Sequence, residues 1–310
     1  MAEKVTESVD IASVLKKYAP TIVLLAIIVG LTVWSFSTGM AAKEGAPAIT
    51  LTAAVLLIVV GLAAGMLGGI IGTGGCSVML PILHFYLGYP VPIAIGTTLF
   101  AVIFTAISGG YGHLIRKNLD VKTTAWLGGF GIIGVVIGSY AFNLLSDQTA
   151  LLGLILGIAF ILPAVRMIVE GVAHRKKSQP EGNVIPGSEG RKGLLGLVVG
   201  VLTGLVGLGG GYALVPGLIY LFNAPVYVTM GTSLATVIPL AVVGGGIKLA
   251  EGYVAIGAAL LLAAGTIVGA QFGAAVIKKF HPATLKLIFG IYFLYVSVKF
   301  ILAYFGVAIF

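Results

Sequence analysis

Apolar runs long enough to cross a lipid bilayer constrain this chain more than any other feature. A helix needs about 20 residues to cross a hydrocarbon core of ~30 Å, and nine such runs follow one another along the 310 residues. They are residues 20–40, 50–72, 92–115, 122–144, 149–171, 193–223, 226–250, 254–277 and 282–304. None alternates apolar and polar residues as a strand of a membrane β-barrel does. The sequence therefore predicts an all-α integral membrane protein.

Composition supports this class and argues against several partners. Only 9% of the residues are charged, whereas soluble domains carry about 25%. The net charge of +8 would suggest a nucleic-acid partner in a soluble protein, but in a membrane protein it reflects orientation, so no nucleic acid is expected. Cys76 is the single cysteine, which excludes an internal disulfide and a cysteine-based metal cluster. We expect the lipid bilayer as the environment and neither a metal nor a cofactor.

The chain divides at two places. Lys16 and Lys17 precede the first apolar run as in a signal peptide, but the run is longer than a usual signal core, so we expect an uncleaved anchor helix. The longest hydrophilic stretch is rich in proline, glycine and charge, as linkers are. The predicted organisation is an N-terminal segment 1–45, a first repeat 46–172, a cytoplasmic linker 173–192 and a second repeat 193–310.

The two halves are copies of each other. A shift of 135 positions aligns residues 61–140 with 196–275 without a gap, and eleven glycines coincide. Chance pairing at this glycine content would give about 2 coincidences. An internal duplication follows. The coinciding pairs include Gly72 with Gly207, Gly74 with Gly209, and Gly75 with Gly210.

These shared glycines interrupt an apolar run in each copy, as "IGTGGCS" at 71–77 and "VGLGGGY" at 206–212. Each glycine costs about 1 kcal/mol in a helix interior relative to alanine. We therefore expect the helix to stop there and the chain to turn back as a re-entrant hairpin. Length agrees, because 193–208 and 211–223 supply 16 and 13 residues, or ~24 and ~20 Å of helix, each short of a full span.

Lysine and arginine positions favour the hairpin over a single crossing. If each glycine-broken run returns to its own side, fourteen Lys and Arg residues fall on one side and only Lys43 and Lys248 on the other. The positive-inside rule assigns the richer side, with the N-terminus, to the cytoplasm. The prediction is a multi-pass protein of the cell membrane with two inverted-topology repeats. Each repeat has a glycine-broken re-entrant helix hairpin plus three transmembrane helices, and an extra N-terminal helix precedes them.

The hairpin tips predict an anion site. Lipid cannot satisfy the backbone groups of a tip, so the tip must lie in protein or line a water-filled cavity. Two inverted tips would meet near the middle of the membrane, where transporters hold their substrates. Glycines let backbone N–H groups approach a ligand, and the helix that follows points its positive end at it. A nucleotide-binding glycine loop is disfavoured, because no strand precedes the glycines and no lysine follows at the required spacing.

Six segments carry a resemblance to a known family. They are "GGIIGTGGCSVMLPIL", "AIGTTLF" and "SGGYGHLIRKNLD" in the first half, and "GLVGLGGGYALVPGL", "TMGTSLAT" and "GAQFGA" in the second. Over roughly residues 50–305 the chain resembles the TauE/SafE sulfite exporter family. The resemblance implies an integral membrane permease for small sulfur-containing or organic anions such as sulfite or sulfonates. We expect this protein to be an alternating-access carrier and not an enzyme. The sequence departs from the family at Cys76, where a third glycine is usual, and in its additional N-terminal helix.

Candidate substrate-binding residues come from the tips and the helices after them. Hydroxyl groups that follow each hairpin can donate hydrogen bonds to an anion, although such hydroxyls also bond to their own helix. Gln271, the most polar residue in its run, is either a ligand or a clasp between helices. The candidates are Gly72, Thr73, Gly74, Gly75, Cys76, Thr97, Thr98, Gly207, Gly209, Gly210, Gly211, Thr232, Ser233 and Gln271.

Few ionisable residues lie near the apolar runs. His84 is either a proton carrier or a hydrogen-bonded structural residue, and we expect Lys248 and Glu251 to form a solvated pair at an outer loop. His113 and Arg116 are expected at the inner mouth.

No run contains a pair of acids, which argues against carboxylate catalysis and against a cation carrier. Two alternatives to an anion carrier stay open, an anion channel and a membrane sulfur-transfer protein that uses Cys76. Coupling of the small anionic substrate to protons is a further option.

Overall fold

The computed structural model describes residues 11–172, 182–276 and 282–307. These residues form eleven α-helices and one π-helix, with no β-strand among them, and seven of the helices are long and apolar enough to cross a membrane. The all-α prediction is confirmed. The helices are α1 (Ile11–Ser37), α2 (Leu51–Ile71), α3 (Cys76–Pro81), η1 (Ile82–Tyr86), α4 (Val91–Leu114), α5 (Val121–Leu145), α6 (Thr149–Val172), α7 (Glu189–Val206), α8 (Gly211–Phe222), α9 (Val226–Ala250), α10 (Ile256–Val276) and α11 (Pro282–Tyr304).

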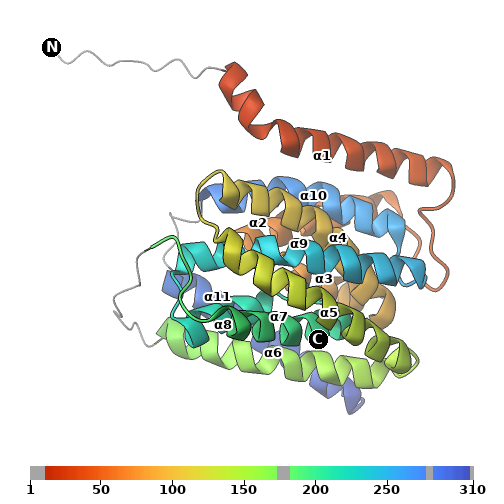
Figure 1. Ribbon diagram of the computed structural model, residues 1–310. Coiled ribbons are helices and arrows are strands. Elements are labelled where there is room, and N and C mark those ends of the chain that lie inside the picture. The colour runs from red at the N-terminus through yellow and green to blue at the C-terminus, as the bar shows by residue number, and fades with distance from the viewer. Residues whose placement is uncertain (1–10, 173–181, 277–281, 308–310) are drawn as a thin grey trace.

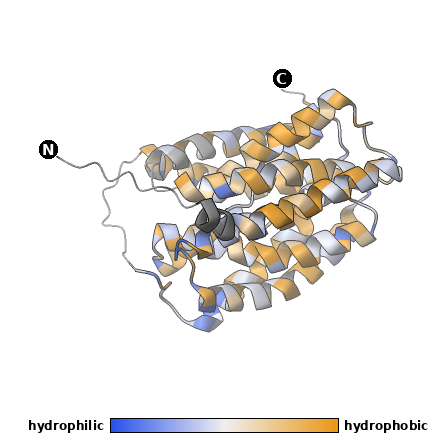
Figure 2. Cartoon of the chain, turned by 90° about the horizontal axis from the view of Figure 1, so that it is seen from above, coloured by the Kyte–Doolittle hydropathy of each residue, from blue (hydrophilic) through white to orange (hydrophobic). Residues whose placement is uncertain are grey.

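The helices lie alongside one another in a bundle with α1 along one edge (Figure 1). Apolar residues cover most of the helix surfaces, and hydrophilic residues gather mainly at loops and helix ends (Figure 2). Helix α1 packs on α10, where Ile28 is fully buried against Leu260, Ala263 and Ile267. The predicted N-terminal helix is therefore present as one element of the bundle.

Helices of the first half pack mainly against helices of the second half. Helix α2 of the first half lies beside α10 of the second, α7 of the second lies beside α5 of the first, and α6 pairs with α11. Glycines allow the close approach, because a Cβ at Gly65 would overlap the carbonyl oxygen of Thr266, and one at Gly200 would overlap that of Gly131. Gly134 and Gly138 also pack tightly, whereas a Cβ added at Gly129 would meet nothing within 4 Å, so this glycine does not serve packing.

The central helices α4 and α9 run antiparallel. Gly96, near the start of α4, lies against Tyr253, which follows the end of α9. Gly231, near the start of α9, lies against Asn118, which follows the end of α4. We call the end of the bundle with residues 115–120 and 182–188 the linker face, on the left of Figure 1, and the end with residues 38–50 and 251–255 the far face. Residues 173–181 of the predicted linker lie outside the described residues.

Both glycine-broken segments fold back as hairpins. Helix α2 runs from the far face and ends at Gly72, beside Met230 in the first turns of α9. The chain then reverses, so that Gly75 lies beside Ala64, two turns back along α2. Helix α3 and η1 lead back to the start of α4 at the far face. In the second hairpin, α7 runs inward from the linker face and α8 leads back to the start of α9 at the same face. Helix α2, with 21 residues, is long enough to count among the seven potential spans.

Candidate functional site

The two hairpin tips have the same backbone conformation. The φ angles of Gly72, Gly74 and Gly75 are +81°, +77° and +82°. Those of Gly207, Gly209 and Gly210 are +71°, +70° and +79°. Residues other than glycine adopt such angles only at a cost of about 1–2 kcal/mol, so the glycines duplicated in the sequence are the ones that the turns require.

The tips meet between the middles of the two central helices. A Cβ at Gly74 would lie 3.1 Å from Val102 of α4 and 3.6 Å from Val237 of α9. A Cβ at Gly209 would lie 3.3 Å from Val102 and 3.3 Å from the sulfur of Cys76. Gly211 is packed directly on Thr73. The structure thus brings together the candidates predicted at the two tips.

Backbone N–H groups at both tips are buried without acceptors. Gly72 still donates to the Gly68 carbonyl at 2.7 Å, and Gly207 to Thr203 at 2.8 Å, which ends α2 and α7. Beyond these bonds, no described residue accepts from the N–H groups of Gly74, Gly75, Gly209, Gly210 or Gly211. Helix starts carry a partial positive charge, and a buried unpaired N–H costs free energy until it finds an acceptor. The tips can therefore offer several donors to one anion.

Thr97 and Thr232 occupy equivalent positions and hold loops at opposite faces. The Thr97 hydroxyl oxygen accepts from the N–H of Ala255 at 2.9 Å, next to the start of α10. The Thr232 hydroxyl oxygen accepts from the N–H of Asp120 at 2.9 Å, next to the start of α5. Both bonds fix a connection between helices, and neither brings the hydroxyl to the tips.

The next residue along each helix lies closer to the tips. The Thr98 hydroxyl donates to the Ala94 carbonyl at 2.8 Å within its own helix, which is the alternative that the sequence left open. The backbone carbonyl oxygen of Thr98 lies 3.7 Å from the Cys76 sulfur. Ser233, by contrast, donates to the Gly72 carbonyl at 2.9 Å. Of the four hydroxyl candidates that follow the hairpins, Ser233 is the one whose hydroxyl is bonded to a tip.

Gln271 clasps three helices. Its amide nitrogen donates to the Ser108 carbonyl of α4 at 2.8 Å and to the Thr21 hydroxyl of α1 at 2.9 Å. Its amide oxygen is buried and has no hydrogen-bond partner among the described residues. These contacts lie away from the tips and correspond to the clasp between helices that the sequence offered as one of two roles.

His113 and Lys248 are equivalent under the 135-residue shift, and both are fully buried. His113 donates from Nε2 to the Gly69 carbonyl at 2.9 Å, in the last turn of α2. The Lys248 ammonium lies 3.4 Å from the centre of the Phe142 ring and 3.5 Å from the Glu251 carboxylate. The expectation of a solvated Lys248 is wrong, because the residues after α9 fold back over it and only Glu251 keeps contact with solvent.

A buried polar network closes the linker face. The Asp120 carboxylate accepts from the N–H and the hydroxyl of Thr123 at 3.0 and 2.8 Å and from the N–H of Ile185 at 2.8 Å. Lys192 donates to the Thr123 hydroxyl at 2.9 Å and to the Ile185 carbonyl at 2.6 Å. Burial favours the neutral acid, but these hydrogen bonds and the Lys192 charge prevail and lower the pKa of Asp120. The "NLD" segment alone gave no sign of this network.

Both hairpin tips and the central helices fall within residues 56–300, which match the family model described as sulfite exporter TauE/SafE. The chain belongs to the TauE/SafE family. It is 29% identical to the probable membrane transporter protein YdhB of Bacillus subtilis, over 71% of this chain and 89% of that one. It is 32% identical to the probable membrane transporter protein MJ0441 of Methanocaldococcus jannaschii, over 75% and 89% of the two chains. No solved structure matches.

Membership makes this TauE/SafE chain a multi-pass membrane transporter and not an enzyme. The matched region begins after α1, so the extra N-terminal helix expected from the sequence lies outside it. Both tips lie inside it. The glycines that are duplicated in the sequence are also the ones that form the two paired tips in the fold of this transporter.

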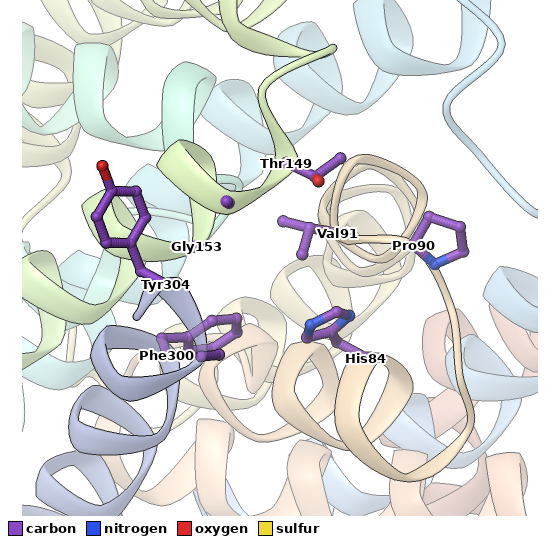
Figure 3. Close-up of a pocket in the computed structure, with 9 residues that line it drawn as sticks. His84, Pro90, Val91, Thr149, Gly153, Phe300 and Tyr304 are labelled. Carbon is purple, nitrogen blue, oxygen red and sulfur yellow. The ribbon is translucent and has the colours of Figure 1, made fainter. Parts of the chain in front are cut away.

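A further cavity of the TauE/SafE bundle opens at the far face, with a volume of about 310 Å³. It lies where η1, α4, α6 and α11 meet, and His84 is one of its walls (Figure 3). The imidazole Nδ1 lies 2.9 Å from the Tyr89 carbonyl oxygen. His84 therefore has the structural hydrogen bond that the sequence proposed as one of its two roles.

Proposed function

We propose that this protein is an alternating-access carrier of small sulfur-containing or organic anions, such as sulfite or sulfonates, and that the two hairpin tips hold the substrate. The observation that carries the proposal is the set of buried N–H groups without acceptors at Gly74, Gly75, Gly209 and Gly210. Such donors bind an anion without a buried positive charge, whose desolvation would be expensive.

The packing of the tips favours a carrier over a channel. Gly211 lies directly on Thr73, and Val102 and Val237 lie beside both tips. A channel needs a continuous path, whereas a carrier closes around its substrate and opens to one side at a time. In this proposal the tips separate when an anion binds, and its oxygens replace the contacts between them.

We infer that the repeats are inverted in the membrane and that the linker face is cytoplasmic. Each hairpin returns to the face from which it started, and α4 runs antiparallel to its equivalent α9. Lys117 and Lys192 lie at the linker face, and the amino-acid sequence of the linker is rich in Lys and Arg. The positive-inside rule then places this face, and the N-terminus, in the cytoplasm of the cell.

The test is uptake of sulfite and of methanesulfonate into proteoliposomes, with and without a proton gradient. We expect saturable uptake of at least one of these anions that is lost in the tip variant Gly209→Ala. Flux that rises linearly with concentration would favour the channel instead. Cys76 is fully buried, so we expect Cys76→Gly to retain transport, and loss of transport in a folded Cys76→Gly protein would favour sulfur transfer at that thiol.

A further inference from the structure

The far-face cavity is separate from the hairpin tips and has a mixed lining. Most of its walls are apolar or small, and His84, Thr149 and Tyr304 supply the polar groups. Figure 3 shows His84 and Phe300 side by side on one wall, with Thr149 and Val91 across from them. The volume of about 310 Å³ lies at the lower end of the range for small-molecule sites. The cavity suits a small ligand with an apolar body.

The hydrogen bonds of His84 fix the chemistry of its pocket side. A carbonyl oxygen only accepts, so Nδ1, 2.9 Å from the Tyr89 carbonyl, carries a hydrogen. In the neutral ring Nε2 then has a lone pair, and no described residue forms a hydrogen bond with it. A proton added to Nε2 turns it into a donor with a positive charge. Phe300 stacks on the ring at 5.8 Å and 6°. Burial and the Lys299 charge favour the neutral ring, so the anion itself must supply the stabilisation that protonates Nε2.

We propose that this cavity is a second binding site, for a small organic monoanion with an apolar body, in which protonated Nε2 of His84 donates to the anionic group. The apolar part of the ligand packs against Phe300 and Val91, and the Thr149 hydroxyl can donate to the same anionic group. Because the neutral ring presents a lone pair that repels an anion, each anion binds together with one proton from water. The ligand class is taken from the proposed function, whereas the cavity itself does not involve the tips.

The charges around His84 are compatible with this coupling. From α11, the Lys299 ammonium lies 4.6 Å from the centre of the neighbouring Phe85 ring, where it attracts an anion and opposes protonation of the imidazole. Tyr86 and Tyr89 follow His84 along the chain, and Tyr295 and Tyr304 face the same region from α11. The cavity walls from α4 and α6 contribute no titratable group. Among the described residues no carboxylate lines the cavity, so none of them competes with the anion.

The test is calorimetric binding of 1-butanesulfonate to the purified full-length chain at pH 6 and pH 8, with n-butanol as the neutral control. We expect butanesulfonate to bind at least tenfold more tightly at pH 6 than at pH 8. The affinity for butanol should be the same at the two pH values. Heats measured in buffers of different ionisation enthalpy should show uptake of close to one proton. Equal affinity at the two pH values would overturn the proposal.

Two substitutions of His84 separate its pocket-side nitrogen from its structural bond. His84→Asn keeps an amide that can donate to the Tyr89 carbonyl but removes the group at Nε2, so we expect at least a tenfold loss of affinity and no pH dependence. His84→Gln keeps a donor near Nε2, so we expect weak binding that does not depend on pH. Unchanged binding in a folded His84→Asn protein would overturn the proposal.

A steric pair tests the location of the site. A Cβ at Gly153 lies at an ordinary 3.5 Å from Phe300, so Gly153→Leu fills the cavity and should abolish binding. Gly129→Leu, at a lipid-facing position with nothing within 4 Å, should leave binding unchanged.

The tip variant Gly209→Ala distinguishes the two sites. We expect it to bind butanesulfonate normally while it loses transport. Binding lost in Gly209→Ala but kept in Gly153→Leu would assign the ligand to the tips, which overturns the second site and leaves the proposed function standing. Normal transport in Gly209→Ala would count against the tips without affecting the cavity.

Discussion

Gly209→Ala is the sharpest test of the tip site. The added methyl group would lie 3.3 Å from both the Cys76 sulfur and Val102, a distance at which side chains must move by a few tenths of an ångström. The φ angle of +70° adds strain of about 1–2 kcal/mol for a residue other than glycine. Folding free energies are about 5–15 kcal/mol, so the variant should fold.

Transport should suffer far more than folding. The methyl group points into the space between the tips, where the proposed anion would accept from backbone N–H groups. A ligand displaced by the width of a methyl group loses good geometry with several donors at once. Loss of one net hydrogen bond to a charged group, about 1.5–3 kcal/mol, corresponds to at least a tenfold fall in the initial rate of uptake.

The assay is the initial rate of sulfite uptake per unit of reconstituted protein, with thermal unfolding in detergent measured in parallel. Gly129→Ala is the matched control, because its methyl group meets nothing within 4 Å and should leave both quantities unchanged. Gly75→Ala should instead lose stability, since its Cβ would lie 2.5 Å from the carbonyl oxygen of Ala64. A folded Gly209→Ala protein with the wild-type rate would refute the placement of the substrate at the tips.

Three further predictions concern hydroxyls, pH and topology. Ser233→Ala should raise the half-saturating substrate concentration several-fold, because it frees the Gly72 carbonyl at a tip. Thr98→Val should change this concentration less than twofold, because the Thr98 hydroxyl bonds to its own helix. Equal effects of the two substitutions would contradict this prediction. Because the folded-state pKa of Asp120 is lowered, its stabilisation is present above about pH 4 and is lost as pH falls through the folded-state pKa. The difference in thermal midpoint between wild type and Asp120→Asn should therefore shrink from pH 7 to pH 3, and a constant difference would show that the charge is unimportant. In cells, Gly182→Cys and Asn223→Cys should both be labelled only from the cytoplasmic side, and opposite labelling of the two would rule out the re-entrant second hairpin.

The hairpins could be predicted because they depend on local properties of the chain. Positive φ angles at Gly72 and Gly207 leave a direct trace in the sequence, since glycine adopts them without strain. Helix length and apolar runs are local as well. The duplication then fixed which glycines mattered, because eleven of them recur at the same spacing, and the structure gives both copies the same turn.

The roles of polar side chains could not be predicted in this way, because hydrogen-bond partners come from distant parts of the chain. Thr97 bonds to a residue 158 positions away and Thr232 to one 112 positions away. The segment "Gly-Thr" followed by a second hydroxyl residue reads the same in the sequence whether its hydroxyls bind a ligand or hold a loop between two helices. Lys248 was misjudged for the same reason, since its burial depends on the fold of the loop after α9 and on Phe142 of another helix.

The two repeats differ in the residues that close each face. Asp120 and Ala255 are equivalent under the 135-residue shift, and both N–H groups bond to the matching threonine. At the linker face Asp120 adds a carboxylate that ties α5 to Ile185, and Lys192 reinforces the tie. At the far face there is no carboxylate at the equivalent position.

If the two repeats were identical, the state open to one side and the state open to the other would have the same contacts with the repeats exchanged. The two states would then have equal free energies. In the proposed carrier, opening the linker face would separate Ile185 from Asp120 and break the 2.8 Å hydrogen bond between them, so this bond favours the state that opens to the far face. A ligand or substitution shifts such an equilibrium only through contacts that differ between the two states. Asp120→Asn should therefore raise the fraction of molecules open at the linker face, whereas a change at Ala255 should have little effect.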